Sequence, residues 1–187
     1  TSPTNWSLAN RSLSHTSNRS DVYGASLLSW YLVEVDPRRR LVVVPGMALR
    51  SRFLRDGALW PVDVLSAGAA RALGRRLLAD ARRSGGGAFK ANDHLYYKAH
   101  LIFDAVDELA RMPSIVETVR SLLQSDDILL WDTSVPIKPP GGPMFPLHQD
   151  ATYWGLDPPD GAVTCWVALS EATAQHGCMT VVRGSHA

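Results

Sequence analysis

The spacing of apolar residues changes near residue 126, and this change narrows the possible folds more than any other feature. Before that point, apolar residues recur every three or four positions, as they do in an amphipathic helix. After it, short stretches rich in β-branched and aromatic residues alternate with turns that contain Pro and Gly. Helices followed by short antiparallel strands predict an α+β domain whose strands form a sandwich or a barrel.

Three helices are predicted in the first part of the chain. The first covers residues 66–83, because Ser66 can cap its N-terminus and a run of glycines from Gly85 ends the pattern. The second covers about 101–111. The third begins near Pro113, whose missing N–H costs little in a first turn. Its predicted buried face consists of Ile115, Val116, Val119, Leu122 and Leu123.

Strands are predicted where apolar stretches alternate or run continuously between loop residues. In the second part of the chain they cover residues 127–137, 147–154, 163–169 and 179–182. The prolines and glycines of residues 139–143 exclude a helix or a central strand between the first two.

Residues 1–46 are predicted to be a tail or an extension that is partly disordered. Up to Ser20 the chain is rich in Ser, Thr and Asn, so it buries too little apolar surface to offset the entropy of ordering. Two apolar clusters, at 27–33 and 41–44, could still form short strands on either side of a turn at Asp36. The Ser-rich start also resembles an organelle-targeting peptide.

Composition excludes several functional classes. The chain has 45% hydrophobic and 20% charged residues, which is typical of a globular protein. Its net charge of +1 gives no general attraction for nucleic acid or anionic lipid, and its apolar runs are too short for a membrane span. The two cysteines fit a reducing compartment. We therefore expect a cytoplasmic monomer, or an organellar one if the N-terminus is a targeting signal, with no nucleic-acid partner.

His148 and Asp150 are the candidate metal ligands. Residues two apart on a strand project to the same face, so the predicted strand 147–154 would place an imidazole nitrogen beside a carboxylate. These are two of the three ligands of a 2-His-1-carboxylate site, which leaves coordination positions open on Fe(II). The pair could also be an ordinary surface ion pair. A third interpretation is a cupin-like zinc or manganese protein whose remaining ligand is one of His94, His100, His176 and His186.

Several blocks in a fixed order resemble the phytanoyl-CoA dioxygenase family of Fe(II)/2-oxoglutarate oxygenases. They are Phe53 to Ala58, Lys138-Pro139-Pro140, His148-Gln149-Asp150, Tyr153-Trp154, Val163 to Leu169, Gly177-Cys178-Met179 and Gly184-Ser185-His186. The resemblance implies that residues 47–187 form N-terminal helices packed on a double-stranded β-helix, a cupin-like jelly-roll. The sequence departs from the family pattern at Arg183, where Pro is usual before the last block.

The resemblance also implies an activity and the roles of individual residues. Fe(II), 2-oxoglutarate and O2 would be used to hydroxylate an unactivated C–H bond of a small-molecule or acyl substrate. His148 and Asp150 correspond to the iron ligands, and a carboxylate at Asp150 argues for hydroxylation over halogenation. The cofactor-binding candidates implied by the family are Lys98, Ser134, Gln149 and Trp166. Trp166 could instead belong to the core, and Lys98 could instead be a solvated lysine.

The family pattern also includes a second His ligand and an Arg that binds the distal carboxylate of 2-oxoglutarate, both well downstream of Asp150. We identify neither in the sequence, and therefore expect a member truncated at its C-terminus with an incomplete jelly-roll. The alternative is a catalytically inactive truncated relative, either a pseudoenzyme or a fragment.

Overall fold

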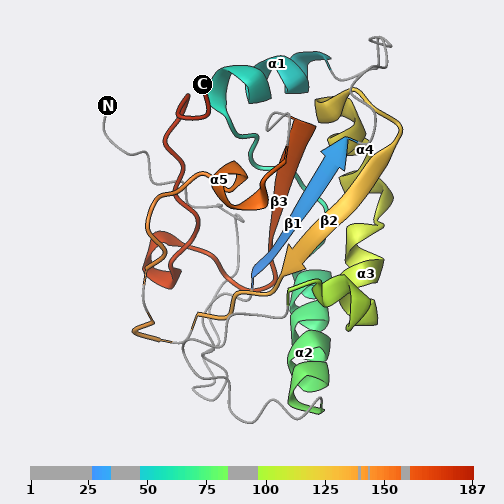
Figure 1. The fold of residues 1–187 in the computed structure, drawn as a ribbon. Coiled ribbons are helices and arrows are strands. Elements are labelled where there is room, and N and C mark those ends of the chain that lie inside the picture. Colours follow the sequence, from blue (N-terminus) through green and yellow to red (C-terminus); the bar gives the residue numbers. More distant parts are fainter. Residues whose placement is uncertain (1–26, 35–46, 84–96, 139, 143, 157–160) are drawn as a thin grey trace.

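The computed structural model describes residues 27–34, 47–83, 97–138, 140–142, 144–156 and 161–187 (Figure 1). The helices are α1 (Met47–Asp56), α2 (Ala67–Arg83), α3 (Asp104–Ala110), α4 (Pro113–Leu123) and α5 (Ala151–Trp154). The strands are β1 (Leu27–Glu34), β2 (Ile128–Ser134) and β3 (Ala162–Ala168). Short 3-10 helices include η1 (Ala99–Leu101) and η3 (Ala174–His176).

The three strands form an antiparallel sheet in the order β2-β1-β3. Figure 1 shows β1, which precedes all of the helices that the structure describes, between the two strands that follow α4. The apolar cluster at 27–33 is therefore confirmed as a strand, whereas the cluster at 41–44 lies outside the described residues. Within the described ranges this sheet does not close into a barrel, so a jelly-roll stays a prediction.

The helices follow their sequence signals closely at α2 and α4. The Oγ of Ser66 accepts a hydrogen bond from the backbone N–H of Ala69 at 3.2 Å, as an N-cap does. Pro113 occupies the first turn of α4, and Gln124 ends that helix in a left-handed conformation. Of the predicted buried face of α4, Ile115, Val119 and Leu122 are buried and Val116 and Leu123 are half-buried.

The predicted helix 101–111 is divided into η1 and α3. Phe103 separates them, because its backbone is extended (φ −119°, ψ 112°) and starts a new helix at Asp104. Its ring is 3% exposed and lies in the core. Continuous helical apolar spacing therefore concealed a break that tertiary packing stabilises.

Two of the predicted strands are wrong. Residues 147–150 form no strand, and residues 151–154 form α5 instead. Local bonds hold this segment, since Tyr153 N–H donates to the Asp150 carbonyl at 2.9 Å and both Leu147 and Tyr153 remain exposed. In residues 179–182 only Val181 forms an isolated bridge. By contrast, β2 and β3 confirm the strands predicted at 127–137 and 163–169.

A β-bulge at Trp131 determines which side chains of β2 lie on each face of the sheet. Tyr31 pairs with Asp132 but the next residue, Leu32, pairs with Leu130, so Trp131 is an extra residue on β2. An extra residue reverses which side chains share a face. The face toward the helices carries Leu130, Thr133, Val163, Cys165 and Val167. The opposite face carries Asp132, Ser134, Thr164 and Trp166.

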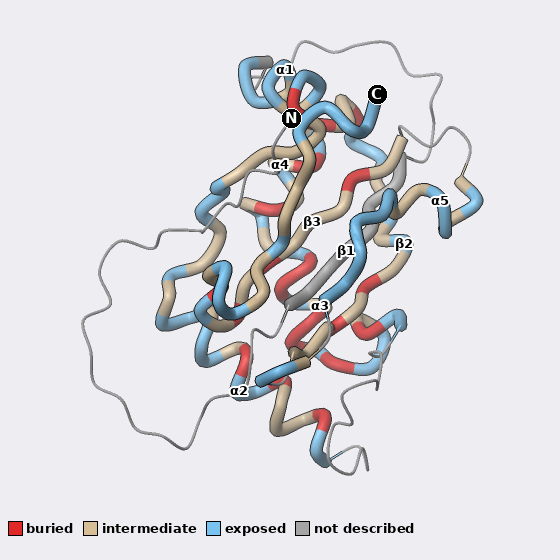
Figure 2. Tube along the Cα trace, turned by 90° about the vertical axis from the view of Figure 1, so that its left-hand side faces the viewer, coloured by how far each residue is buried: buried red, intermediate tan, exposed pale blue. Residues whose placement is uncertain are grey.

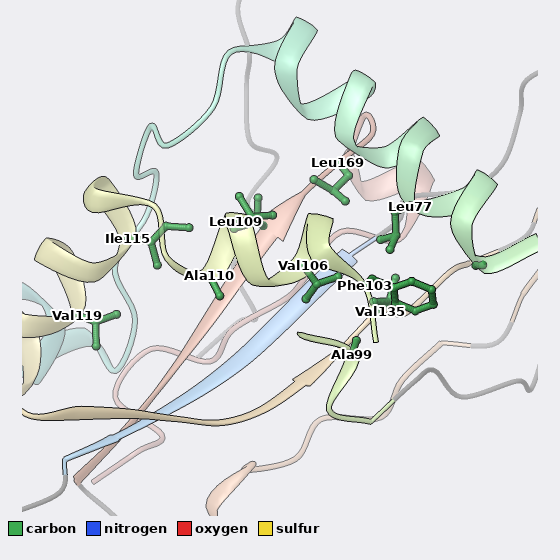
Figure 3. Close-up of a cluster of buried hydrophobic side chains, with 12 residues drawn as sticks. Leu77, Ala99, Phe103, Val106, Leu109, Ala110, Ile115, Val119, Val135 and Leu169 are labelled. Carbon is green, nitrogen blue, oxygen red and sulfur yellow. The ribbon is translucent and has the colours of Figure 1, made fainter. Parts of the chain in front are cut away.

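The main core lies between α2, α3, α4 and the first of these faces (Figure 3). Its largest fully buried side chains are Leu109, Leu169, Val106, Val119 and Thr133. Figure 2 shows buried segments along α3, while α5 and the C-terminal end are mostly exposed. No helix among the described residues is both long and apolar enough to cross a membrane. The helices therefore pack on one face of the sheet.

Candidate metal-binding site

His148 and Asp150 face each other although no strand aligns them. The Nε2 atom of His148 lies 3.1 Å from Oδ1 of Asp150. The other ring nitrogen of His148, Nδ1, bonds to the carbonyl oxygen of Pro146 at 2.7 Å. The ring of His148 also meets the ring of Tyr153 edge to face, with centroids 5.9 Å apart. The pair is thus oriented by local contacts, and both of its side chains keep solvent access, with exposed fractions of 41% and 29%.

The bond to Pro146 decides which nitrogen of His148 can bind a metal. A carbonyl oxygen only accepts, so Nδ1 must carry the proton and Nε2 of a neutral ring must carry a lone pair. That lone pair points at a carboxylate oxygen. The two facing atoms, 3.1 Å apart, are placed so that one cation could bind both of them.

The separation of the two donors fits a shared metal ion. Two donor atoms that each lie about 2.1 Å from an ion, at a right angle, are about 3.0 Å apart. The observed distance is 3.1 Å, and the donors are an imidazole nitrogen and a carboxylate oxygen. A hydrogen bond to a carbonyl on the far ring nitrogen is also the usual support of a metal-binding histidine. The chemistry of this donor set therefore suits Fe(II) or a similar divalent ion.

Thr164 is a site residue that the sequence analysis missed. Its Oγ1 donates to Oδ2 of Asp150 at 2.9 Å, which leaves Oδ1 as the oxygen next to His148. Thr164 lies on β3 two positions before Trp166, so the two side chains share the face opposite the helix core. The alternation of side chains along the predicted strand 163–169 could have identified Thr164, because it places Thr164 on the same face as the candidate Trp166.

Two of the cofactor candidates, Ser134 and Trp166, lie on the sheet face that carries Thr164. Ser134 and Trp166 are both paired in register with Ser29, so they lie across the sheet from each other on the same face as Thr164. Trp166 packs with Ala172, Ala168 and Cys178.

Gln149 and Lys98 make contacts of their own. The side-chain amide of Gln149 donates to the carbonyl of Ser185 at 2.6 Å. The backbone N–H of Lys98 donates to Oδ1 of Asp132 at 2.9 Å. Its ammonium group donates to the backbone carbonyl of Trp131 and lies 4.6 Å from the centroid of the Trp131 indole ring. Lys98 is thus held at β2, and a role toward 2-oxoglutarate stays a prediction.

The remaining histidines are engaged elsewhere. The backbone N–H of His100 donates to Oγ1 of Thr133 on the core side of the sheet, and burial followed by the charge of Lys98 lowers the pKa of its ring. His176 bonds to Thr173, and His186 donates to the Leu54 carbonyl. His94 lies outside the described residues. Among the residues that the structure does describe, no three His, Cys, Asp or Glu side chains gather as a metal-binding group.

Comparison with known proteins places these residues in a wider context. A family model described as phytanoyl-CoA dioxygenase (PhyH) matches residues 53–187. A probable alpha-ketoglutarate-dependent hypophosphite dioxygenase of Stutzerimonas stutzeri is 36% identical over 89 residues, which are 46% of this chain and 30% of the relative. A peroxisomal phytanoyl-CoA dioxygenase of Homo sapiens is 30% identical over 79 residues, which are 40% of this chain and 23% of the relative.

A third relative, a probable phytanoyl-CoA dioxygenase of Caenorhabditis elegans, is 29% identical over 85 residues, covering 42% of this chain and 27% of the relative. The part of the chain that matches therefore covers less than a third of the length of each of these curated relatives. No solved structure matches the chain.

Proposed function

Because the chain belongs to the phytanoyl-CoA dioxygenase family, we propose that it carries two of the iron ligands of an Fe(II)- and 2-oxoglutarate-dependent dioxygenase. Its relatives are named as dioxygenases, one of them as alpha-ketoglutarate-dependent. The reaction proposed is hydroxylation of an unactivated C–H bond in a small-molecule or acyl substrate. The fold proposed for the whole domain is a cupin-like double-stranded β-helix, of which β1, β2 and β3 form one sheet.

The observation that carries this proposal is the convergence of His148 Nε2 and Asp150 Oδ1 at 3.1 Å. His148 presents a lone pair because its Nδ1 is bonded to Pro146, and Asp150 presents one oxygen because Thr164 holds the other. When bound at such a site, Fe(II) and 2-oxoglutarate activate O2 and yield succinate and CO2 beside the oxidised substrate. The protein's part is to hold two neighbouring positions of the ion and leave others open.

The cofactor pocket proposed here lies on the face of the sheet that carries Thr164. Ser134 and Trp166 occupy the same cross-strand row of that face. An indole beside the ion would exclude water from the co-substrate and pack against its carbon chain. Gln149, which lies between the two metal ligands in the chain, and Lys98 complete the proposed set.

Exposed apolar side chains near His148 support a substrate with an apolar part. Met144 is 86% exposed, Leu147 67% and Tyr153 74%, and all three lie within a few residues of the metal pair. Tyr153 also contacts the His148 ring, and exposed apolar side chains beside a site are common where a ligand with an apolar part binds. The relatives are named for two different substrates, hypophosphite and phytanoyl-CoA, so the substrate itself must come from experiment.

Titration of the full chain with Co(II), followed by absorbance and with and without 2-oxoglutarate, tests this function. We expect binding that weakens at least about 10-fold in both His148→Ala and Asp150→Ala, because each removes one of two converging donors. His176→Ala is the matched control, since His176 is bonded to Thr173 in an exposed turn. Release of succinate on addition of Fe(II) and 2-oxoglutarate would extend the result to catalysis. A chain that neither binds the ion nor releases succinate would support the inactive relative.

A further inference from the structure

Residues 183–186, here called the C-terminal block, are held by the end of α1. Arg183 donates from Nη2 to Oδ1 of Asp56 at 2.7 Å, and the backbone N–H of Gly184 donates to the carbonyl of the same residue at 3.0 Å. His186 donates from Nε2 to the carbonyl of Leu54 at 2.9 Å. One residue of α1 therefore binds the block through both its side chain and its backbone, across 127 positions of sequence.

Asp56 is well suited to be a fixed anchor. It is only 7% exposed, and Arg55 donates to both of its oxygens, at 2.9 and 2.8 Å. The guanidinium groups of Arg55 and Arg183 hold the pKa of the Asp56 carboxyl well below its usual range. A carboxylate that is shielded from water and bonded to two guanidinium groups makes charge-assisted hydrogen bonds, which are the stronger class.

The fit between α1 and this block is close. Gly57 follows the helix with a positive φ of 75°, a conformation that residues other than Gly rarely adopt. A Cβ atom on Gly57 would lie 2.8 Å from Cγ of His186, which is closer than real contacts allow. Figure 1 shows the C-terminal end beside α1. His186 can therefore hold this place only if residue 57, which follows α1, has no Cβ atom.

The C-terminal block also contacts the segment that carries the candidate metal ligands His148 and Asp150. The Ser185 carbonyl accepts the side-chain amide of Gln149 at 2.6 Å, and Gln149 stands between His148 and Asp150 in the chain. Residues 147–149 belong to no helix or strand, so few backbone bonds fix them. Thr164 holds one end of this segment through Asp150, and Ser185 holds its middle.

We propose that Arg183 is a positioning residue for His148 and Asp150. It would act from Asp56 through the Ser185 carbonyl on Gln149, and so keep the two ligands at the separation that a metal ion requires. The inference rests on the proposed metal site.

Arg183→Met tests the proposal, with Arg55→Met as the matched control. Both variants remove one guanidinium group from Asp56, but only the first breaks a contact to the C-terminal block. Arg183→Lys is the conservative variant that restores the charge. Three quantities are measured on the full chain: the Co(II) dissociation constant, the urea midpoint of unfolding, and the ¹⁵N resonances of the His148 ring and the Gln149 side chain without metal.

We expect Arg183→Met to weaken Co(II) binding about 10-fold and to shift the Gln149 and His148 resonances, as loss of an outer contact does at metal sites. Arg55→Met should leave both within error of the wild type, and Arg183→Lys should fall between. Equal Co(II) affinity and unchanged resonances in Arg183→Met would overturn the inference while leaving the metal site intact. If Arg183→Met does not fold, the same comparison is made with Arg183→Lys.

Failure of the two proposals can be told apart. If the wild type itself binds no Co(II), the proposed function fails, and the metal-free resonances decide the inference. A shift confined to Arg183→Met then supports positioning of residues 148–150, and no shift overturns it.

Discussion

Thr164 donates a hydrogen bond of 2.9 Å to Oδ2 of Asp150, and this bond joins a strand of the sheet to the segment that carries the candidate metal ligands. It fixes the rotation of the carboxylate, so that Oδ1 and not Oδ2 lies beside His148. A second bond, from Gln149 to Ser185, restrains the same segment from the C-terminal side.

Replacing Thr164 by Val should weaken metal binding. The variant loses the hydroxyl that orients Asp150, and loss of such an outer contact costs about 10-fold in metal affinity. Thr164→Ser should bind nearly as the wild type does, because it keeps the donor. Co(II) titration measures the effect, with Thr118→Val as the control, since the hydroxyl of Thr118 donates to the carbonyl of Ser114 within its own helix. Equal affinities in Thr164→Val and Thr118→Val would contradict the assignment.

Gly57→Ala should destabilise the fold more than Gly141→Ala. Both glycines have a positive φ, 75° and 72°, so both substitutions carry a conformational cost of about 1 kcal/mol. Only at Gly57 does the added Cβ also meet a side chain, that of His186, whereas nothing lies within 4 Å at Gly141. Urea unfolding of the two variants gives the difference.

The double variant Gly57→Ala/His186→Ala separates these two costs. It should recover the part of the loss caused by contact with His186 and keep the part caused by the backbone. Equal losses in Gly57→Ala and Gly141→Ala would show that the C-terminal block does not pack on α1 as described.

Phe103→Ala should cost about 3–5 kcal/mol of unfolding free energy, because its ring is 3% exposed in the core. Leu101→Ala, in a side chain that is 75% exposed, should change the free energy of unfolding by less than about 0.5 kcal/mol. The comparison tests the break between η1 and α3. In one continuous helix over 101–111, Phe103 would have no extended backbone to direct it into the core. A small loss for Phe103→Ala would therefore favour the continuous helix.

Stability should fall as the pH decreases through the range in which histidine titrates. Burial, followed by the positive charge of Lys98, lowers the pKa of His100 below the ordinary histidine value of about 6.5. The unfolded chain therefore binds a proton at a pH where the folded chain does not, and folding loses free energy as pH falls below about 6.5. Above that pH both states are neutral and the loss vanishes.

His100→Gln should remove this part of the pH dependence. Urea unfolding of the wild type and of the variant is compared at about pH 7.5 and about pH 5.5, on either side of the usual histidine pKa. The control is His176→Gln, because His176 is exposed. A difference between wild type and His100→Gln that is the same at both pH values would contradict the expectation.

Several elements could be predicted from the sequence because their signals are local. Ser66, the apolar stripe and the following glycines determine the limits of α2, and Pro113 marks the start of α4. The strands β2 and β3 follow from short apolar stretches bounded by turns. The family also followed from the sequence, because the order of its blocks survives in the chain.

Other features depend on partners that are distant in the sequence. The backbone of Phe103 is extended because its ring packs in the core, and the bulge at Trp131 exists only against β1. No periodicity reveals an extra residue in one strand, because that residue is defined by the register of its neighbour. The strand predicted at 147–154 failed for the same reason, since alternation alone supplies no strand to pair with.

The sequence by itself determined which donors the site has, an imidazole and a carboxylate two residues apart at His148 and Asp150. Only the tertiary structure decided how they converge. They meet without a strand, because Pro146 fixes the proton on Nδ1 of His148 and Thr164 holds the outer oxygen of Asp150. Residue types and spacing can be read from the chain. The direction of a lone pair depends instead on hydrogen-bond partners that are set on folding, one of them two residues away at Pro146 and the other on β3 at Thr164.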